Sequence, residues 1–402
     1  MGKVGQKDMK ATEKLFYEDS HLKEFDAVVL SCQPDGEKFK AVLDRTAFFP
    51  EGGGQYADTG FIGEAEVFDV HEKEDIVFHY VNVPLKEGES VHGKINWEER
   101  FEKMQQHSGE HIISGIVHER FGYNNVGFHL GSDYCTMDFD GAITKEQLKE
   151  IELKANRAVF ENLDIEVTYP SKEELKDMEY RSKIEIEGQV RIVTVPGYDV
   201  CACCAPHVKK TGEIGLIKLV NMANYKGGER VTMLCGYRAL RDYDRKDENS
   251  KEISVALCAK EPEISQAVSH LKEEQTALKG KVASLTQKLL KYQAQEIEIT
   301  EGVVTVFDSE LSGNAPRELM NQLLNRGALV SAVFAGNDED GYRYVIGSRS
   351  EDVRPISKKL NEAFHGRGGG KPEMVQGSLS GKAEDIRKNC KNTCEVSLMC
   401  GK

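Results

Sequence analysis

Two segments far apart in the sequence carry residues of the types that bind transition metals. His107 and His111 are four positions apart, an interval that places both imidazoles on one face of a helix. Cys203 and His207 repeat that interval with a thiolate and an imidazole. Zn²⁺ prefers a tetrahedral set of nitrogen and sulfur donors, and these residues supply one. The pattern predicts one zinc ion per chain, and a hydrolytic zinc site is the leading hypothesis.

Two alternatives accompany this assignment. Cys203 is preferred as the thiolate because it keeps the interval to His207, but Cys201 and Cys204 are close enough in sequence to replace it. Glu110 also completes a His-x-x-Glu-His pattern, typical of inverzincin metalloproteases, in which the glutamate activates zinc-bound water. Those proteases take an acidic third ligand, which would leave the Cys-x-x-x-His pair without a purpose. A metalloprotease is therefore the weaker hypothesis.

The hydrophobic pattern indicates which elements position these residues. Short β-branched and aromatic runs in residues 26–96 predict a small β-barrel or sandwich. Helical periodicity then runs from Trp97 to a stop at Phe121–Gly122, so both signature histidines lie in a helix. We predict an α+β protein of several domains. Their expected bounds are 1–96 for the β-barrel, 97–245 for an α+β zinc domain, 246–298 for a helical spacer and 299–402 for an α/β domain.

The predicted spacer has the clearest periodicity in the chain. Its apolar residues recur in alternating steps of four and three, which indicates a coiled coil. Gln275 is a lone polar position in this seam and can fix the register. Pairing between chains would give a homodimer; the alternatives are a hairpin and an amphipathic helix packed on its own domain. The seam consists of Ile264, Val268, Leu271, Gln275, Leu278, Val282, Leu285, Leu289 and Tyr292.

Charge is distributed unevenly along the 402 residues. The net charge of −14 disfavours a nucleic-acid partner for the chain as a whole. Residues 341–372, however, hold seven basic and three acidic side chains, a net charge of +4, which indicates a local footprint for nucleic acid. Within them, His365 and Pro372 stand where a Walker A loop needs Gly and Ser or Thr. We predict instead a glycine loop that holds an RNA backbone, flanked by Arg367 and Lys371.

Composition also limits the cellular setting. Charges interrupt each hydrophobic stretch before it reaches membrane-spanning length, and the first residues do not read as a secretory signal. Ten cysteines in such a chain predict reduced thiols rather than disulfides. We therefore expect a cytosolic protein with no membrane partner. A C-terminal group of Cys390, Cys394 and Cys400 is interpreted as an unconstrained end rather than a metal or redox site.

Motifs spread along the chain gain a further meaning when they are taken together. They are Thr46–Gln55, Met104–His111, Gly127–Gly131, Cys203–Gly215, Lys226–Arg230, Gly236–Leu240 and the glycine-rich stretch from residue 366 to Gly377. As a set they resemble the alanyl-tRNA editing family in its long, free-standing form, and the last one resembles the DHHA1 domain, which is linked to tRNA binding. One departure is the second metal motif, where the family usually has Cys-Gly-Gly-Thr-His and this chain has Cys204, Ala205 and Pro206 between the ligands.

The resemblance implies a hydrolase that cleaves the ester joining serine, or glycine, to the acceptor end of tRNA(Ala). Such an enzyme is needed because serine differs from alanine by one hydroxyl and glycine by one methyl. A difference of that size lets a synthetase discriminate against the wrong amino acid by only about 1–3 kcal/mol. Ser108 and Gln55 become candidates for reading the serine hydroxyl, and Glu110 a candidate base. The residues assigned to tRNA binding are Lys226, Arg230, Arg367, Gly368, Gly369, Gly370 and Lys371.

Two other interpretations remain. The editing domain of threonyl-tRNA synthetase has a similar zinc pattern, but the glycine-rich Thr46–Gln55 element and the DHHA1-like end argue against it. A site with every ligand position filled also fits a structural zinc, which would make the chain a non-catalytic, zinc-stabilised tRNA-binding protein.

Overall fold

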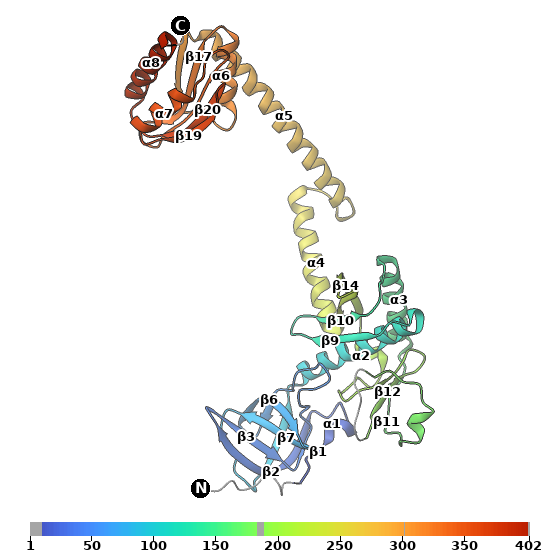
Figure 1. Cartoon of the computed structure of the whole chain (residues 1–402). Helices are drawn as coiled ribbons and strands as arrows, with labels where there is room; N and C mark the ends of the chain where they lie inside the picture. Colours follow the sequence, from blue (N-terminus) through green and yellow to red (C-terminus); the bar gives the residue numbers. More distant parts are fainter. Residues whose placement is uncertain (1–9, 183–188, 301, 401–402) are drawn as a thin grey trace. The chain divides into compact units, whose positions relative to one another are not determined.

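The computed structural model describes residues 10–182, 189–300 and 302–400, with side chains up to residue 393. The chain divides into two compact units, Met1–Glu252 and Ile253–Lys402 (Figure 1). The prediction of an α+β protein with more than one domain is confirmed. Among the described residues, no helix combines the length and the apolar character needed to cross a bilayer.

The first unit begins with a closed β-barrel. Along its longest strand, β2, alternate residues such as Phe25, Ala27 and Val29 are buried and their neighbours are exposed, as the period of two in a strand requires. The elements are β1 (Glu13–Lys14), α1 (Leu15–Glu18), β2 (Glu24–Asp35), β3 (Lys38–Leu43), β4 (Arg45–Thr46), β5 (Gly60–Ile62), β6 (Ala65–Lys73), β7 (Ile76–Val81) and β8 (Ser90–Ile95). The barrel closes in the order β2-β3-β7-β6-β5-β8, and residues 47–59 connect β4 to β5.

The rest of the first unit packs around helix α2 (Trp97–Phe121), which matches the predicted helix. Its residues 103–117 are buried, because α3 and both sheets contact it; Gly122, with a φ of 71°, ends it in a left-handed cap. The sheets have the orders β14-β15-β10-β9 and β11-β12-β13. The elements are β9 (Asn125–Leu130), β10 (Cys135–Phe139), α3 (Lys145–Glu161), β11 (Glu166–Thr168), η2 (Glu174–Lys176), β12 (Ile192–Val195), β13 (Asp199–Ala202), η3 (Thr211–Ile214), β14 (Ile217–Tyr225), β15 (Gly228–Cys235) and α4 (Gly236–Leu257).

The second unit is a mixed sheet with helices on both faces. Helix α6 covers one face, and α7 and α8 cover the other. The strand order is β16-β17-β18-β20-β19, with β16 and β17 parallel and the other neighbours antiparallel. The elements are η4 (Glu261–Glu263), α5 (Ile264–Glu296), β16 (Val303–Asp308), α6 (Ala315–Asn325), β17 (Val330–Asn337), β18 (Gly341–Ser348), α7 (Arg354–Ala363), β19 (Arg367–Lys371), β20 (Met374–Leu379) and α8 (Ala383–Cys400).

The prediction of a glycine loop in this unit is wrong. Residues 367–371 form the edge strand β19, which pairs with β20. A Cβ on Gly368 would lie 2.5 Å from the hydroxyl oxygen of Tyr344, so glycine lets this buried tyrosine pack beneath the strand.

In the C-terminal cysteine group, Cys390 is buried in α8, and the side chains of Cys394 and Cys400 lie outside the described residues.

The predicted coiled-coil seam lies on α5. Leu290 and Ala294 of this helix are buried in a core shared with α6, whereas the seam residues from Leu271 to Tyr292 lie on the open surface. The exposed fractions are 53% for Leu271, 61% for Leu278, 62% for Val282, 56% for Leu285, 58% for Leu289 and 67% for Tyr292. Within its own unit, the helix therefore leaves its seam uncovered, and pairing through this seam stays a prediction.

Candidate metal centre

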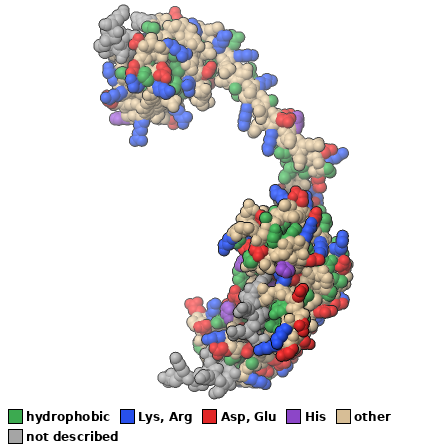
Figure 2. Space-filling view, turned by 45° about the vertical axis from the view of Figure 1, so that its right-hand side comes forward, with side chains coloured by type: hydrophobic (Ala, Val, Ile, Leu, Met, Phe, Trp, Pro, Cys, Tyr) green, Lys and Arg blue, Asp and Glu red, His purple; other side chains and the backbone are tan. Residues whose placement is uncertain are grey.

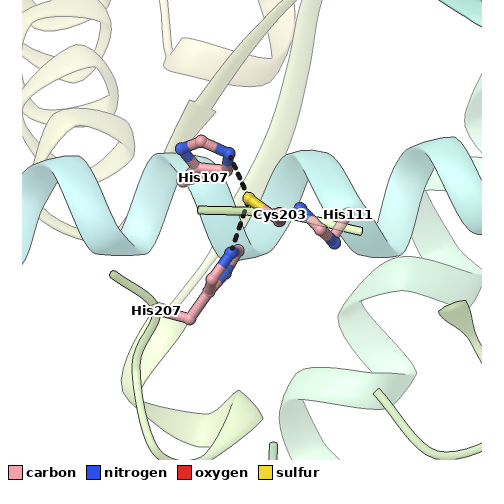
Figure 3. A group of neighbouring side chains, drawn as sticks. All are labelled: His107, His111, Cys203 and His207. Atoms are coloured by element: carbon pink, nitrogen blue, oxygen red, sulfur yellow. Dashed lines mark hydrogen bonds between the residues drawn. The ribbon is translucent and has the colours of Figure 1, made fainter. Parts of the chain in front are cut away.

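The structure brings the four predicted metal ligands together. His107 and His111 project from the same side of α2, and Cys203 and His207 approach them from the segment after β13 (Figure 3). One ligand atom from each residue lies within 4.8 Å of the others. The Cys203 Sγ atom is 3.5 Å from His107 Nε2 and 3.4 Å from His207 Nε2. The histidines are buried and the cysteine is half-buried, so the site is nearly closed to water.

Each imidazole is oriented through the nitrogen that faces away from the thiolate. His107 Nδ1 lies 3.2 Å from Gln55 Oε1, His111 Nδ1 lies 3.0 Å from Asp199 Oδ2, and His207 Nδ1 lies 3.0 Å from Ser108 Oγ. Metal-binding histidines in proteins are held in this way, because a polar partner at one ring nitrogen orients the ring and leaves the other nitrogen for the ion.

The residues therefore fit zinc in both respects. The donor set is three imidazoles and one thiolate, and each of the three rings has a partner at Nδ1 that leaves Nε2 for the ion.

The charges around the site favour the metal-binding form of the thiol. Burial would raise the pKa of Cys203, but the neighbouring imidazoles, His107 first among them, outweigh burial and hold it well below its usual value. Burial and the neighbouring His111 lower the pKa of His207 to about 3, which keeps this ring neutral. A thiolate beside a neutral imidazole is the protonation state that metal binding requires.

Asp199 and Arg181 extend the site and were not among the predicted residues. Arg181 donates to both carboxylate oxygens of Asp199, at 2.7 and 2.9 Å, and Asp199 in turn faces His111. Burial would raise the pKa of Asp199, but His111 and Arg181 outweigh it and lower the pKa. Glycine at 115 allows this approach, because a Cβ there would lie 2.8 Å from the Asp199 Cβ. Asp199 lies two positions before Cys201 in the alternating strand β13 and four positions before Cys203, which follows that strand; this spacing is a signal that could have identified it.

The two alternative cysteines lie beside the ligand group rather than in it. Cys201 groups with His111 and Asp199. The Cys204 Sγ atom instead lies against the glycine turn, 3.3 Å from where a Cβ on Gly53 would stand.

The predicted catalytic residues lie at the same place but already have partners. Ser108 is fully buried, and its hydroxyl accepts from the Val208 N–H at 3.2 Å in addition to facing His207. Glu110 Oε1 accepts from Ser114 Oγ and from Asn125 Nδ2, both at 2.6 Å. The structure thus holds both side chains inside the protein, against the groups that surround α2.

Gln55 reaches the site from a glycine turn that α2 holds in place. Gly52 and Gln55 exchange backbone hydrogen bonds of 3.0 and 3.1 Å, and Gly53 and Gly54 have φ angles of 61° and 81°, which favour glycine. Further along the same loop, buried Arg100 of α2 pairs with buried Asp58 and donates to Ala47 O at 2.6 Å.

Lys103, one turn further along α2, donates to Ala57 O at 2.6 Å. The helix that carries two metal ligands therefore also anchors the loop that carries Gln55.

The residues predicted to bind tRNA fall into two groups, one in each unit. Lys226 lies in the turn between β14 and β15, and the neighbouring Arg230 pairs bidentately with Asp138 and stacks on Tyr225, with 3.8 Å between the guanidinium carbon and the ring centroid. Arg367 to Lys371 form the exposed edge strand β19. The Arg230 guanidinium is thus already engaged, whereas the residues of β19 are exposed.

Comparison with known proteins identifies three regions of the chain. Residues 190–235 match the threonyl and alanyl tRNA synthetase second additional domain, which includes Cys203 and His207. Residues 4–99 match the model for class II (A) tRNA synthetases. Residues 300–395 match the DHHA1 domain, and this range contains the sheet of the second unit together with α6, α7 and most of α8.

Whole-chain relatives extend these matches. The chain is 26% identical over 397 residues to the alanyl-tRNA editing protein AlaX-L of Pyrococcus horikoshii, covering 93% of this chain and 96% of that protein. It is 28% identical over 387 residues to the alanyl-tRNA editing protein Aarsd1 of Rattus norvegicus, covering 90% and 93%. The alanine–tRNA ligase of Pyrococcus furiosus is 31% identical over 404 residues, but the chain spans only 43% of that protein's length.

Proposed function

Because the chain belongs to the long-form alanyl-tRNA editing family, we propose that it is a zinc-dependent hydrolase that removes serine from mischarged tRNA(Ala). The reaction breaks the ester between the amino acid and the terminal ribose; water supplies a hydroxyl to the acyl group and a proton to the ribose oxygen. The observation that carries the proposal is the group of His107, His111, Cys203 and His207, with ligand atoms within 4.8 Å of one another.

The protein residues around the ion have separable roles in this proposal. A zinc ion held by the four ligands would supply a positive charge that orients and polarises the aminoacyl group. Ser108 and Asp199 keep the rings of His207 and His111 in the tautomer that binds an ion. Glu110 is less suited to act as a base than its position suggests, since its Oε1 already accepts from two donors. The same engagement weakens the metalloprotease alternative.

Serine is the expected amino acid, and glycine is a second candidate. A synthetase site for alanine cannot strongly reject either one, because each differs from alanine by a single small group. A second hydrolytic site is therefore required for both, and the proposal assigns that task to this chain. Since tRNA charging takes place where proteins are made, the same assignment implies a cytosolic location.

The second unit supports a role in holding the tRNA body. Two cavities of about 510 and 1110 Å³ adjoin at Gln376 beside strand β19. Lys and Arg side chains stand out on the visible face of this unit and its long helix (Figure 2). Guanidinium and ammonium groups along such a groove attract phosphates. The basic residues that line the two cavities are Arg317, Arg349 and Lys371 in one and Arg343 and Arg367 in the other.

The exposed seam of α5 supports a homodimer. An apolar stripe of this length is unfavourable in water, and a second copy of the helix presents its complement. In a parallel pair, Gln275 meets Gln275 of the partner, a polar contact that fixes register. Glu274 and Lys279 are five positions apart and of opposite charge, the spacing at which a parallel coiled coil pairs its flanking residues between chains.

A deacylation assay tests the proposal. The purified protein is incubated with Ser-tRNA(Ala), and Ala-tRNA(Ala) and Ser-tRNA(Thr) are run alongside. We expect rapid loss of serine from tRNA(Ala) only, abolished by Cys203→Ala and by chelation, and retained in Cys204→Ala as the matched control. No turnover of any substrate would leave the non-catalytic zinc-stabilised tRNA-binding protein as the better account. Deacylation that survives chelation and Cys203→Ala would refute the zinc assignment.

A further inference from the structure

The Gln55 side chain contains an unsatisfied donor beside the metal ligands. Its side chain is 1% exposed, and its Oε1 lies 3.2 Å from His107 Nδ1. Its Nε2 has no acceptor within the described part of the chain. A buried amide N–H without a partner costs about 1–3 kcal/mol. Such a group is rare in native proteins and calls for an explanation.

The orientation of this carboxamide follows from the state of His107. When His107 binds an ion through Nε2, its Nδ1 carries the proton and must donate. Only the oxygen end of the Gln55 amide can accept that bond, so the NH₂ end is turned away from His107. Because the hydrogen-bond network decides which end of an amide is which, the contact with His107 leaves Gln55 Nε2 as a donor with no partner among the described residues.

The turn that carries Gln55 is rigid enough to hold a donor in place. Its backbone N–H and carbonyl are both used in bonds to Gly52. The following residues are fixed to α2 through the buried pair of Asp58 and Arg100 and through the bond from Lys103 to Ala57 O. A donor fixed before substrate arrives costs no reorganisation during reaction, which is the property that makes such groups effective in catalysis.

Building on the proposed function, we propose that Gln55 Nε2 donates to the carbonyl oxygen of the scissile ester. The carbonyl oxygen gains negative charge as water attacks, and a fixed N–H donor stabilises that charge. The carbonyl oxygen can only accept a hydrogen bond, so it needs a donor. A serine hydroxyl can either donate or accept, so it does not need one. Gln55 therefore serves catalysis for any aminoacyl group in the site, rather than the recognition of serine that the family resemblance first suggested.

Gln55→Glu separates the two ends of the side chain. The carboxylate still accepts from His107 Nδ1, so we expect zinc content to stay at one ion per chain. The donor is lost, so kcat for deacylation should fall by about 10²–10³-fold, equally for Ser-tRNA(Ala) and Gly-tRNA(Ala). The matched control is Gln55→Met, which loses both ends and should also weaken zinc binding by about 10–100-fold.

Binding of non-hydrolysable analogues gives a readout that does not depend on turnover. In these probes an amide replaces the ester in 3′-seryl or 3′-glycyl derivatives of adenosine, and calorimetry measures affinity. Gln55→Glu should weaken both analogues by about 2- to 10-fold. Loss for the seryl analogue alone, loss of zinc in Gln55→Glu, or unchanged kinetics would each overturn the inference. If the wild-type protein deacylates neither tRNA, the proposed function itself fails, and this inference with it.

Discussion

The buried pair of Arg100 and Asp58 is the contact whose removal should cost most outside the metal site. Arg100 is 0% exposed and Asp58 is 1% exposed. The guanidinium donates to Asp58, to Ala47 O at 2.6 Å and to Ser20 O at 3.2 Å. Arg100→Met leaves the carboxylate buried with the Phe49 N–H as its remaining protein donor among the described residues. Breaking a buried pair in this way costs about 3–5 kcal/mol.

Tryptophan fluorescence can measure this cost in the first unit. Trp97 is the only tryptophan in the chain, lies one turn before Arg100, and stacks on Phe101 with ring centroids 5.4 Å apart. For a unit of this size, 3–5 kcal/mol corresponds to a fall in Tm of roughly 6–20 °C. The matched control is Arg120→Met on the same helix, whose partner Glu150 is exposed; it should change stability by less than about 1 kcal/mol.

A double substitution decides whether the pairing itself is responsible. Arg100→Met with Asp58→Asn removes both charges, and we expect a coupling energy of about 1–3 kcal/mol between the two positions. Chemical denaturation of the single and double variants provides the cycle. Two results would contradict this account: Arg100→Met lowers the free energy of unfolding no more than Arg120→Met does, or the effects of Arg100→Met and Asp58→Asn simply add. In either case the Arg100–Asp58 pair is not the stabilising contact that we describe.

Three further predictions address other parts of the chain. Burial lowers the pKa of His79 in the barrel to about 4; because the unfolded state binds this proton more readily, stability should fall as pH drops from about 6.5 towards 4, by roughly 1.4 kcal/mol per unit. His79→Gln should flatten that dependence in fluorescence-monitored unfolding, and an equally steep curve would contradict it. Leu278→Glu should convert a dimer to a monomer in analytical ultracentrifugation, whereas Lys281→Ala should leave it dimeric; a monomeric wild type would remove the basis for pairing. Arg343→Ala should weaken tRNA binding and reduce the salt slope by about 1, while Lys388→Ala on α8 should not, and equal effects would argue against the groove at Gln376.

Sequence periodicity predicted the elements well because each depends mainly on its own residues. The helix expected from Trp97 to Phe121 is α2, and the left-handed Gly122 ends it as a glycine commonly does. The ligand intervals could be recognised for the same reason, since i and i+4 on a helix fix two side chains locally.

Contacts between distant segments could not be predicted in that way. Gln55 and His107 are 52 positions apart, and a periodic pattern shows which face of an element is buried without showing which residues meet across it. Asp199 escaped notice because its partner His111 lies on another element. The glycine-rich stretch was misassigned because glycines carry no side-chain pattern, and its pairing partner is the only feature that distinguishes a strand from a loop there.

Helix α2 explains why these distant parts form one site. Arg100, Lys103, His107 and His111 follow steps of three and four, so all four lie on the same side of the helix. Arg100, which pairs with Asp58 of the glycine loop, and the ligand His107 are seven positions apart, a rise of about 10 Å. The helix thus sets the distance from the anchored glycine loop to the metal ligands. The buried side chains of Arg100 and Lys103 therefore position the loop that carries Gln55, in addition to stabilising the fold. A sequence pattern that places buried cations and metal-binding histidines on one helical face is therefore a sign that a second segment is being held against the site.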